Sequence, residues 1–98
     1  MGEREYKFIY RDKINQLGIA IAAIRKMRGM TQEQLSEKSG ISRTFLSSIE
    51  APGTSCPFSL EVLYALSDAL EVKPGDLLNF ADYPEKILNN KQNEDSRK

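Results

Sequence analysis

The sequence has no histidine, no tryptophan and only one cysteine, Cys56. A single cysteine cannot close a disulfide within the chain, and one thiolate is too few to build a metal site from one chain. The sequence also has no glycine-rich phosphate loop and no nucleophile beside a general base. These absences predict that the protein is not an enzyme and uses no metal or other cofactor, so that its function is binding.

Long apolar runs and export signals are also lacking. The longest apolar cluster covers residues 18–24 and is followed at once by basic residues, so it falls short of the roughly 18 apolar residues that a membrane span requires. The N-terminal stretch MGEREYKFIYRDK is charged throughout, whereas a secretory signal has an apolar centre. We therefore expect a cytoplasmic protein with no membrane partner and no small-molecule ligand.

Charge is balanced over the whole chain but not along it. The 98 residues have a formal net charge of zero. Residues 1–50 carry nine Lys and Arg against six Asp and Glu, a net charge of +3, so residues 51–98 sum to −3. This asymmetry would orient a small protein with its basic half towards a polyanion. A chain of this length buries a single modest core, which predicts one domain.

Apolar residues at helical spacing predict an all-α fold. The first helix is expected at residues 12–27, with Asp12 as its cap and Gly29 just beyond its end. A fourth helix should follow the cap residue Ser59, and a short fifth helix should start at Pro74. The expected packing residues of these last two helices are Leu60, Leu63, Leu66 and Leu70, followed by Leu77, Leu78 and Phe80.

Two short helices joined by a tight turn are expected between the first helix and the fourth. Thr31 is followed three residues later by Gln34, a capping-box pattern in which the two side chains satisfy free backbone donors at the start of a helix. Gly40 should end that helix, and Ser42 is a natural N-cap for the next one. Residues 31–50 therefore predict a helix, a three-residue turn and a second helix.

The helix at residues 42–50 should have two opposed faces. At about 100° per residue, its apolar residues fall on one side, and a hydroxyl-rich side with one arginine faces away from them. The apolar residues are Phe45, Leu46 and Ile49, and the polar ones are Arg43, Thr44, Ser47 and Ser48. Short hydroxyls allow close approach to phosphates and base edges, and an arginine can bond guanine through O6 and N7. The face is either a DNA-reading surface or an ordinary solvated one.

The stretch TQEQLSEKSGISRTFLSSIE, residues 31–50, resembles the helix-turn-helix of the lambda-repressor-like family, of Cro/cI (XRE) type. The resemblance extends over residues 17–78, from LGIAIAAIRKMRGM to SLEVLYALSDALEVKPGDLL. It implies a five-helix lambda-repressor-like DNA-binding domain in which the third helix enters the major groove. The implied function is a sequence-specific transcriptional regulator of double-stranded DNA, expected to be a repressor that binds an inverted-repeat operator as a homodimer.

The resemblance also implies roles for individual residues. Base reading falls to Arg43, Thr44 and Ser48, and phosphate contacts fall to Gln32, Ser42 and Ser47. Nearby Arg28, Lys26 and Lys38 are either phosphate contacts or solvated cations, and Arg28 is the one that we include in the phosphate-contacting set. Arg25 and Glu50 stand where the family commonly has a structural ion pair between the first and third helices.

The chain departs from the family pattern in two regions. Ser36 and Ser39 replace an alanine and an apolar residue, which predicts looser packing of the helix-turn-helix. The loop at residues 51–58 is longer than usual and lacks the common basic residue after Glu50, which predicts the loss of a phosphate contact. Within that loop Cys56 is either an inert thiol or a redox sensor.

Three segments are expected, and some of their roles stay open. Residues 1–11 form an N-terminal arm, residues 12–83 the DNA-binding domain, and residues 84–98 a polar tail expected to be disordered. The arm's Tyr6, Phe8 and Tyr10 suit a strand, a packing arm or a dimer contact. The expected dimer surface consists of Leu78, Phe80, Tyr83, Ile87 and Leu88. The alternative function is a protein-interaction adaptor or antitoxin that uses the same fold.

Overall fold

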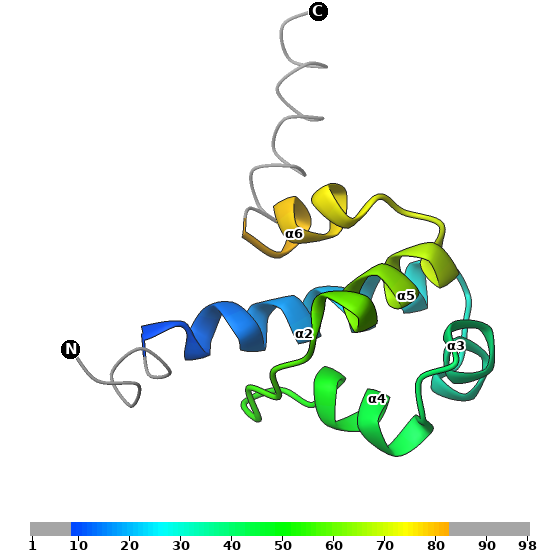
Figure 1. The fold of residues 1–98 in the computed structure, drawn as a ribbon, viewed down its shortest axis with the longest axis horizontal. Helices are drawn as coiled ribbons and strands as arrows, with labels where there is room; N and C mark the ends of the chain where they lie inside the picture. Colours follow the sequence, from blue (N-terminus) through cyan, green and yellow to red (C-terminus); the bar gives the residue numbers. More distant parts are fainter. Residues whose placement is uncertain (1–8, 83–98) are drawn as a thin grey trace, which may run out of the picture.

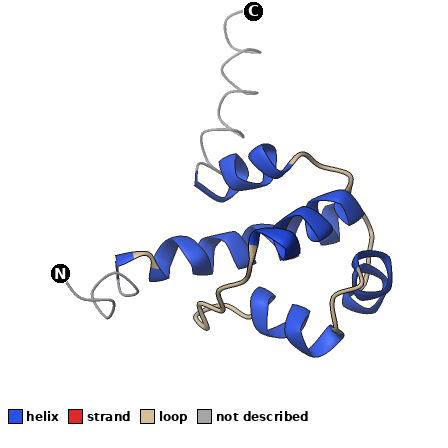
Figure 2. Ribbon diagram, viewed as in Figure 1, coloured by secondary structure: helices blue, strands red, loops and turns tan. Residues whose placement is uncertain are grey.

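The computed structural model describes residues 9–82, which form five helices and no strand (Figures 1 and 2). The helices are α2 (Arg11–Met27), α3 (Gln32–Ser39), α4 (Arg43–Glu50), α5 (Leu60–Leu70) and α6 (Pro74–Asp82). The long helix α2 contacts α4, α5 and α6, while α3 packs on α4 and α5. The predicted all-α class is therefore confirmed. Residues 1–8 and 83–98, with most of the expected arm and tail, lie outside the described residues.

Helix α2 begins slightly earlier than its sequence predicts. Tyr10 occupies the N-cap position without a side-chain cap hydrogen bond, and Asp12 lies inside the first turn. The prediction of Asp12 as the cap is wrong, because the helix already starts at Arg11. Within the first turn, the carboxylate of Asp12 instead complements the positive end of the helix dipole. The predicted end is confirmed, since Gly29 adopts a left-handed conformation with φ of 70°.

The core is built from the predicted apolar stripes, with two exceptions. Its largest fully buried apolar side chains are Ile21, Leu35, Leu46, Leu66, Leu70 and Leu77. Leu60 is 70% exposed, because it lies at the open first position of α5, one turn ahead of buried Leu63. Leu78 is 43% exposed. Neighbouring helical residues point about 100° apart, and with Leu77 fully buried, Leu78 lies towards the edge of the core.

The predicted caps of α3 and α4 are confirmed. Thr31 and Gln34 form the reciprocal capping box, and Gly40 ends α3 with φ of 79°. The Ser42 hydroxyl accepts a hydrogen bond from the Phe45 N–H and caps α4.

The two unusual serines bind the turn rather than loosen it. Ser36 Oγ donates to the Ile41 carbonyl at 2.5 Å, and Ser39 Oγ accepts from the Ile41 N–H at 3.1 Å. Both hydroxyls are thus bonded to the turn backbone, while Leu35 and Leu46 on either side of the turn are fully buried. The expected loosening of the helix-turn-helix is therefore not found, because the hydroxyls replace apolar contact with hydrogen bonds.

No helix in the described part of the chain combines the length and the apolar character needed to cross a bilayer.

Candidate nucleic-acid interface

The outer face of α4 carries the side chains predicted to read bases. Arg43, Thr44 and Ser48 are exposed, while Leu46 and Ile49 on the opposite side are buried. The first turn of α4 has no acidic residue, and within residues 9–82 the Arg43 guanidinium makes no ion pair. A cation free of neighbouring carboxylates can approach a polyanion without first losing an internal bond.

One hydroxyl of α4, that of Ser48, is bonded to the backbone of its own helix. Ser48 Oγ donates to the Thr44 carbonyl at 3.2 Å. In this arrangement the proton is used within the helix, so the exposed Ser48 oxygen is left to act as an acceptor. An outward-facing acceptor suits the amino group of adenine or cytosine.

A buried ion pair holds the far end of α4 against α2. Arg25 Nε lies 2.9 Å from Glu50 Oε2, and Arg25 Nη2 donates to Glu50 Oε1 at 3.0 Å. The two residues are only 8% and 5% exposed. The guanidinium also donates from Nη1 to the Met30 carbonyl at 2.7 Å, which binds the chain leading into α3. The structure thus places Arg25 and Glu50 as a bidentate pair that joins three segments.

Gln32, expected to contact phosphate, is part of the same cluster. Its Nε2 donates to Glu50 Oε1 at 3.0 Å. A primary amide has two N–H donors, so one remains for a ligand. The sequence carries no signal for this bond, because Gln32 and Glu50 lie on different helices.

A surface groove runs beside this cluster between α2 and α4. Its lining includes Lys26 of α2, Gln32 at the start of α3, Ser47 of α4 and Pro52 just after α4. The groove brings together the two predicted phosphate contacts Gln32 and Ser47 with a lysine whose role the sequence left open. Within the described residues, Lys26 has no carboxylate partner. An ammonium, an amide and a hydroxyl in one groove are donors suited to phosphate oxygens.

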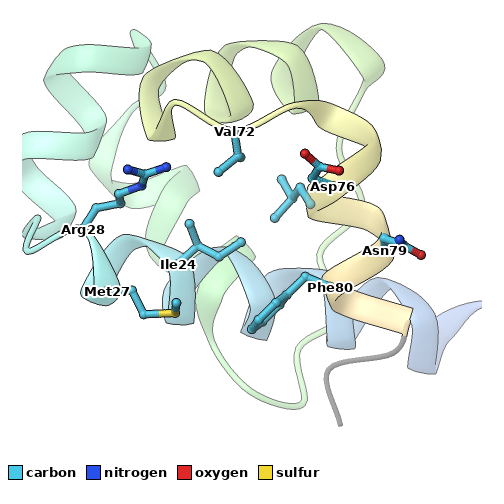
Figure 3. Close-up of a pocket in the computed structure, with 8 residues that line it drawn as sticks. Ile24, Met27, Arg28, Val72, Asp76, Asn79 and Phe80 are labelled. Atoms are coloured by element: carbon cyan, nitrogen blue, oxygen red, sulfur yellow. The ribbon is translucent and has the colours of Figure 1, made fainter. Parts of the chain in front are cut away.

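Arg28 lies away from this groove. Its Nη2 donates to the Glu71 carbonyl at 3.1 Å. Its side chain lines an apolar pocket between the end of α2 and α6, together with Met27, Val72 and Phe80 (Figure 3). The structure therefore does not bring Arg28 together with Gln32 and Ser47, whereas Lys26 joins them.

The predicted dimer residues are only partly described. Phe80 is half-buried in the pocket of Figure 3, and Leu78 is 43% exposed on α6. The remaining three, Tyr83, Ile87 and Leu88, lie outside the described residues, as do Tyr6 and Phe8 of the arm. Cys56 is half-buried in the loop after α4.

The fold of this chain is shared with known proteins. The family model of the Cro/C1-type helix-turn-helix DNA-binding domain matches residues 20–82. No curated protein matches the chain. Among solved structures, the crystal structure of a single-residue mutant of the restriction-modification controller protein C.Esp1396I is similar, at 32% sequence identity and a TM-score of 0.65. The match covers 78% of this chain and 91% of the controller protein chain.

Proposed function

Because the chain belongs to the Cro/C1-type helix-turn-helix DNA-binding family, we propose that it is a repressor that binds an inverted-repeat operator as a homodimer. Membership confirms the lambda-repressor-like resemblance of residues 17–78 and makes the protein a DNA-binding transcriptional regulator. The operator, the repressor role, the homodimer, the cytoplasmic location and the lack of enzymatic activity are parts of the proposal.

The observation that carries the proposal is the surface formed by α4 and the adjoining groove. Its polar side chains include exposed hydroxyls, the half-buried amide of Gln32 and two exposed cations without carboxylate partners among the described residues. An ordinary solvated helix face mixes lysines with acids. A face with no acid and with short side chains suits close contact with the major groove and its flanking phosphates.

The geometry supports separate sets of residues for base contacts and for backbone contacts along this surface. We expect α4 to lie in the major groove with Arg43 bonding a guanine and with Thr44 and Ser48 at neighbouring base edges. Gln32, Ser42, Ser47 and Lys26 then contact the sugar-phosphate backbone, which fixes the orientation of α4. The bond from Gln32 to Glu50 restrains the amide before DNA arrives, so less side-chain entropy is lost on binding.

The size of the reading surface supports a homodimer. One subunit offers a single reading helix, whereas two subunits related by a two-fold axis read two half-sites about 34 Å apart. Exposed Leu78 on α6 supports a dimer contact on that side of the molecule. Repression by covering a promoter needs no ligand or further domain.

The proposal is tested by selecting bound sequences from random duplex DNA at two salt concentrations, using the full chain and the variants Arg43→Ala and Gln32→Ala. We expect an enriched inverted repeat. Arg43→Ala should blur one base position in each half-site, with about 1–3 kcal/mol of discrimination lost there. Gln32→Ala should weaken binding to all sequences alike.

Two outcomes of this selection would contradict the proposal. Binding with no enriched sequence would show that the protein has no specific operator. No binding at all would favour a protein partner, as expected for an adaptor or antitoxin. A uniform loss from Arg43→Ala would overturn its base-reading role alone.

A further inference from the structure

The loop that follows α4 adjoins the proposed DNA surface but carries no charge of its own. Residues 51–58 read APGTSCPF, without a lysine or arginine. Ala51 and Pro52 line the groove that also contains Gln32 and Lys26. A segment beside a reading helix is close to the next stretch of phosphates, where a cation is the usual contact.

This loop is bonded to the N-terminal part of α2. The Gly53 N–H donates to Asn15 Oδ1 at 2.6 Å, and Ser55 Oγ donates to the Arg11 carbonyl at 2.8 Å. Ser55 has φ of 49°, in the left-handed region that a serine seldom adopts, so its bond to Arg11 helps to hold that conformation. In Figure 1 the loop, drawn in green, runs back from α4 towards the blue half of α2.

The loop is bonded to α4 as well. Thr54 Oγ1 lies 2.8 Å from both the Ser48 carbonyl and the Ala51 carbonyl, either of which can accept its proton. The position of residue 11 relative to the reading helix is therefore set by hydrogen bonds on both sides of the loop.

The Arg11 side chain differs from the neighbouring lysine on α2. Lys13 lies 3.9 Å from Asp82 and so faces α6. Arg11 is exposed, and within residues 9–82 no carboxylate lies within ion-pair distance of it. Arg11 lies one helical turn before Asn15, whose side chain bonds the loop, so the two residues share a face of α2. No acid in the described part of the chain competes for the Arg11 cation.

We propose that Arg11 binds a DNA phosphate beside the loop 51–58 and supplies the positive charge that this loop lacks. The inference rests on the proposed DNA-binding function. Arg11 and Lys26 are about 22 Å apart along α2 at about 1.5 Å per residue. A DNA strand carries a phosphate about every 3.4 Å of its axis, so the two residues contact different phosphates. Residue 11 thereby compensates for the missing basic residue after Glu50.

The test compares Arg11→Ala with Lys13→Ala, which removes the same charge from the same helix on the side that faces α6. Binding of the full-length chain to its selected duplex is measured over a range of salt concentrations. The slope of log K against log salt is negative, and each lost phosphate contact reduces its magnitude by about 0.9 per subunit. Arg11→Ala should therefore bind about fivefold more weakly per subunit at 0.15 M salt and about fifteenfold more weakly at 0.05 M. Lys13→Ala should leave the slope unchanged, and Arg11→Lys should retain most of it.

Phosphate ethylation interference on the same duplex identifies the contact directly. Ethylation of one phosphate in each half-site should inhibit the wild-type chain and Lys13→Ala but not Arg11→Ala. If the wild-type chain binds and Arg11→Ala matches Lys13→Ala in both slope and interference pattern, the inference is overturned while the proposed function stands. If the wild-type chain binds no duplex, both are overturned.

Discussion

At the scale of single residues, Glu50 links its own helix α4 to two others. Its carboxylate accepts hydrogen bonds from Arg25 on α2 and from Gln32 on α3. The residue is 5% exposed, so its negative charge is stable only while these donors surround it. One side chain thus links the stability of α4 to the position of a predicted phosphate contact.

Glu50→Ala should lower the free energy of unfolding by about 3–5 kcal/mol, because it leaves the Arg25 cation buried without a counter-charge. Denaturant unfolding measures the loss. The matched control is Asp82→Ala, which removes the acid of a surface pair whose side chains are 63% and 43% exposed. That change should cost at most about 1 kcal/mol. Similar losses in the two variants would show that burial of the Arg25–Glu50 pair has no energetic consequence.

The sequence predicted the members of this ion pair, but only through the family resemblance. It did not predict which neighbouring cation reaches the groove. On a helical wheel, Lys26 and Arg28 lie on opposite sides of Arg25, by about 100° and about 60°. Their order along the chain does not reveal which side faces Gln32, since Gln32 belongs to another helix. The structure places Lys26 there and bonds Arg28 to the Glu71 carbonyl.

At the scale of helices, the close approach of α2 to α4 depends on Gly18. A Cβ atom at this position would overlap the Ile49 carbonyl oxygen, which belongs to the α4 backbone and cannot rotate away. Gly18 lies in the middle of α2, where a glycine costs helix stability relative to alanine. Packing of the reading helix therefore outweighs helix propensity at this residue.

Gly18→Ala should destabilise the protein by about 1–3 kcal/mol, because α4 must shift to make room for the added methyl group. The control is Gly75→Ala near the start of α6, where an added Cβ meets nothing within 4 Å. Alanine at that position should be neutral or stabilising by up to about 1 kcal/mol. Thermal unfolding of both variants measures the difference, and a stable Gly18→Ala variant would show that the α2–α4 contact is not tight.

At the scale of the whole molecule, cations differ in how they are paired. Lys13 and Lys38 lie near the carboxylates of Asp82 and Glu71, and Arg28 bonds a backbone carbonyl. Within residues 9–82, Arg43 and Lys26 on the proposed DNA surface have no such partner. A protein whose net charge is zero can thus present an unpaired basic surface, because a matching excess of acidic residues lies elsewhere in the chain.

This difference predicts separate effects for two cations close together on α2. Lys26→Ala should reduce the slope of log K against log salt by about 0.9 per subunit, since it removes a phosphate contact. Arg28→Ala should change that slope little, because its side chain lies between α2 and α6. Titration of each variant with the selected operator over a range of salt concentrations makes the comparison. The reverse ranking would restore Arg28 as the phosphate contact and exclude Lys26.

The sequence by itself determined the local features of this protein. The capping box at Thr31, the left-handed Gly40 and the cap at Ser42 act between residues close in the chain, so their chemistry can be read without a fold. The apolar and polar sides of α4 follow from helical periodicity in the same way.

Only the tertiary structure decided how separate segments meet. The bond from Gln32 to Glu50, the position of Lys26 in the groove and the attachment of the loop to Arg11 all join residues of different segments. Such contacts depend on the angles between packed helices, and no periodicity within a single helix encodes those angles.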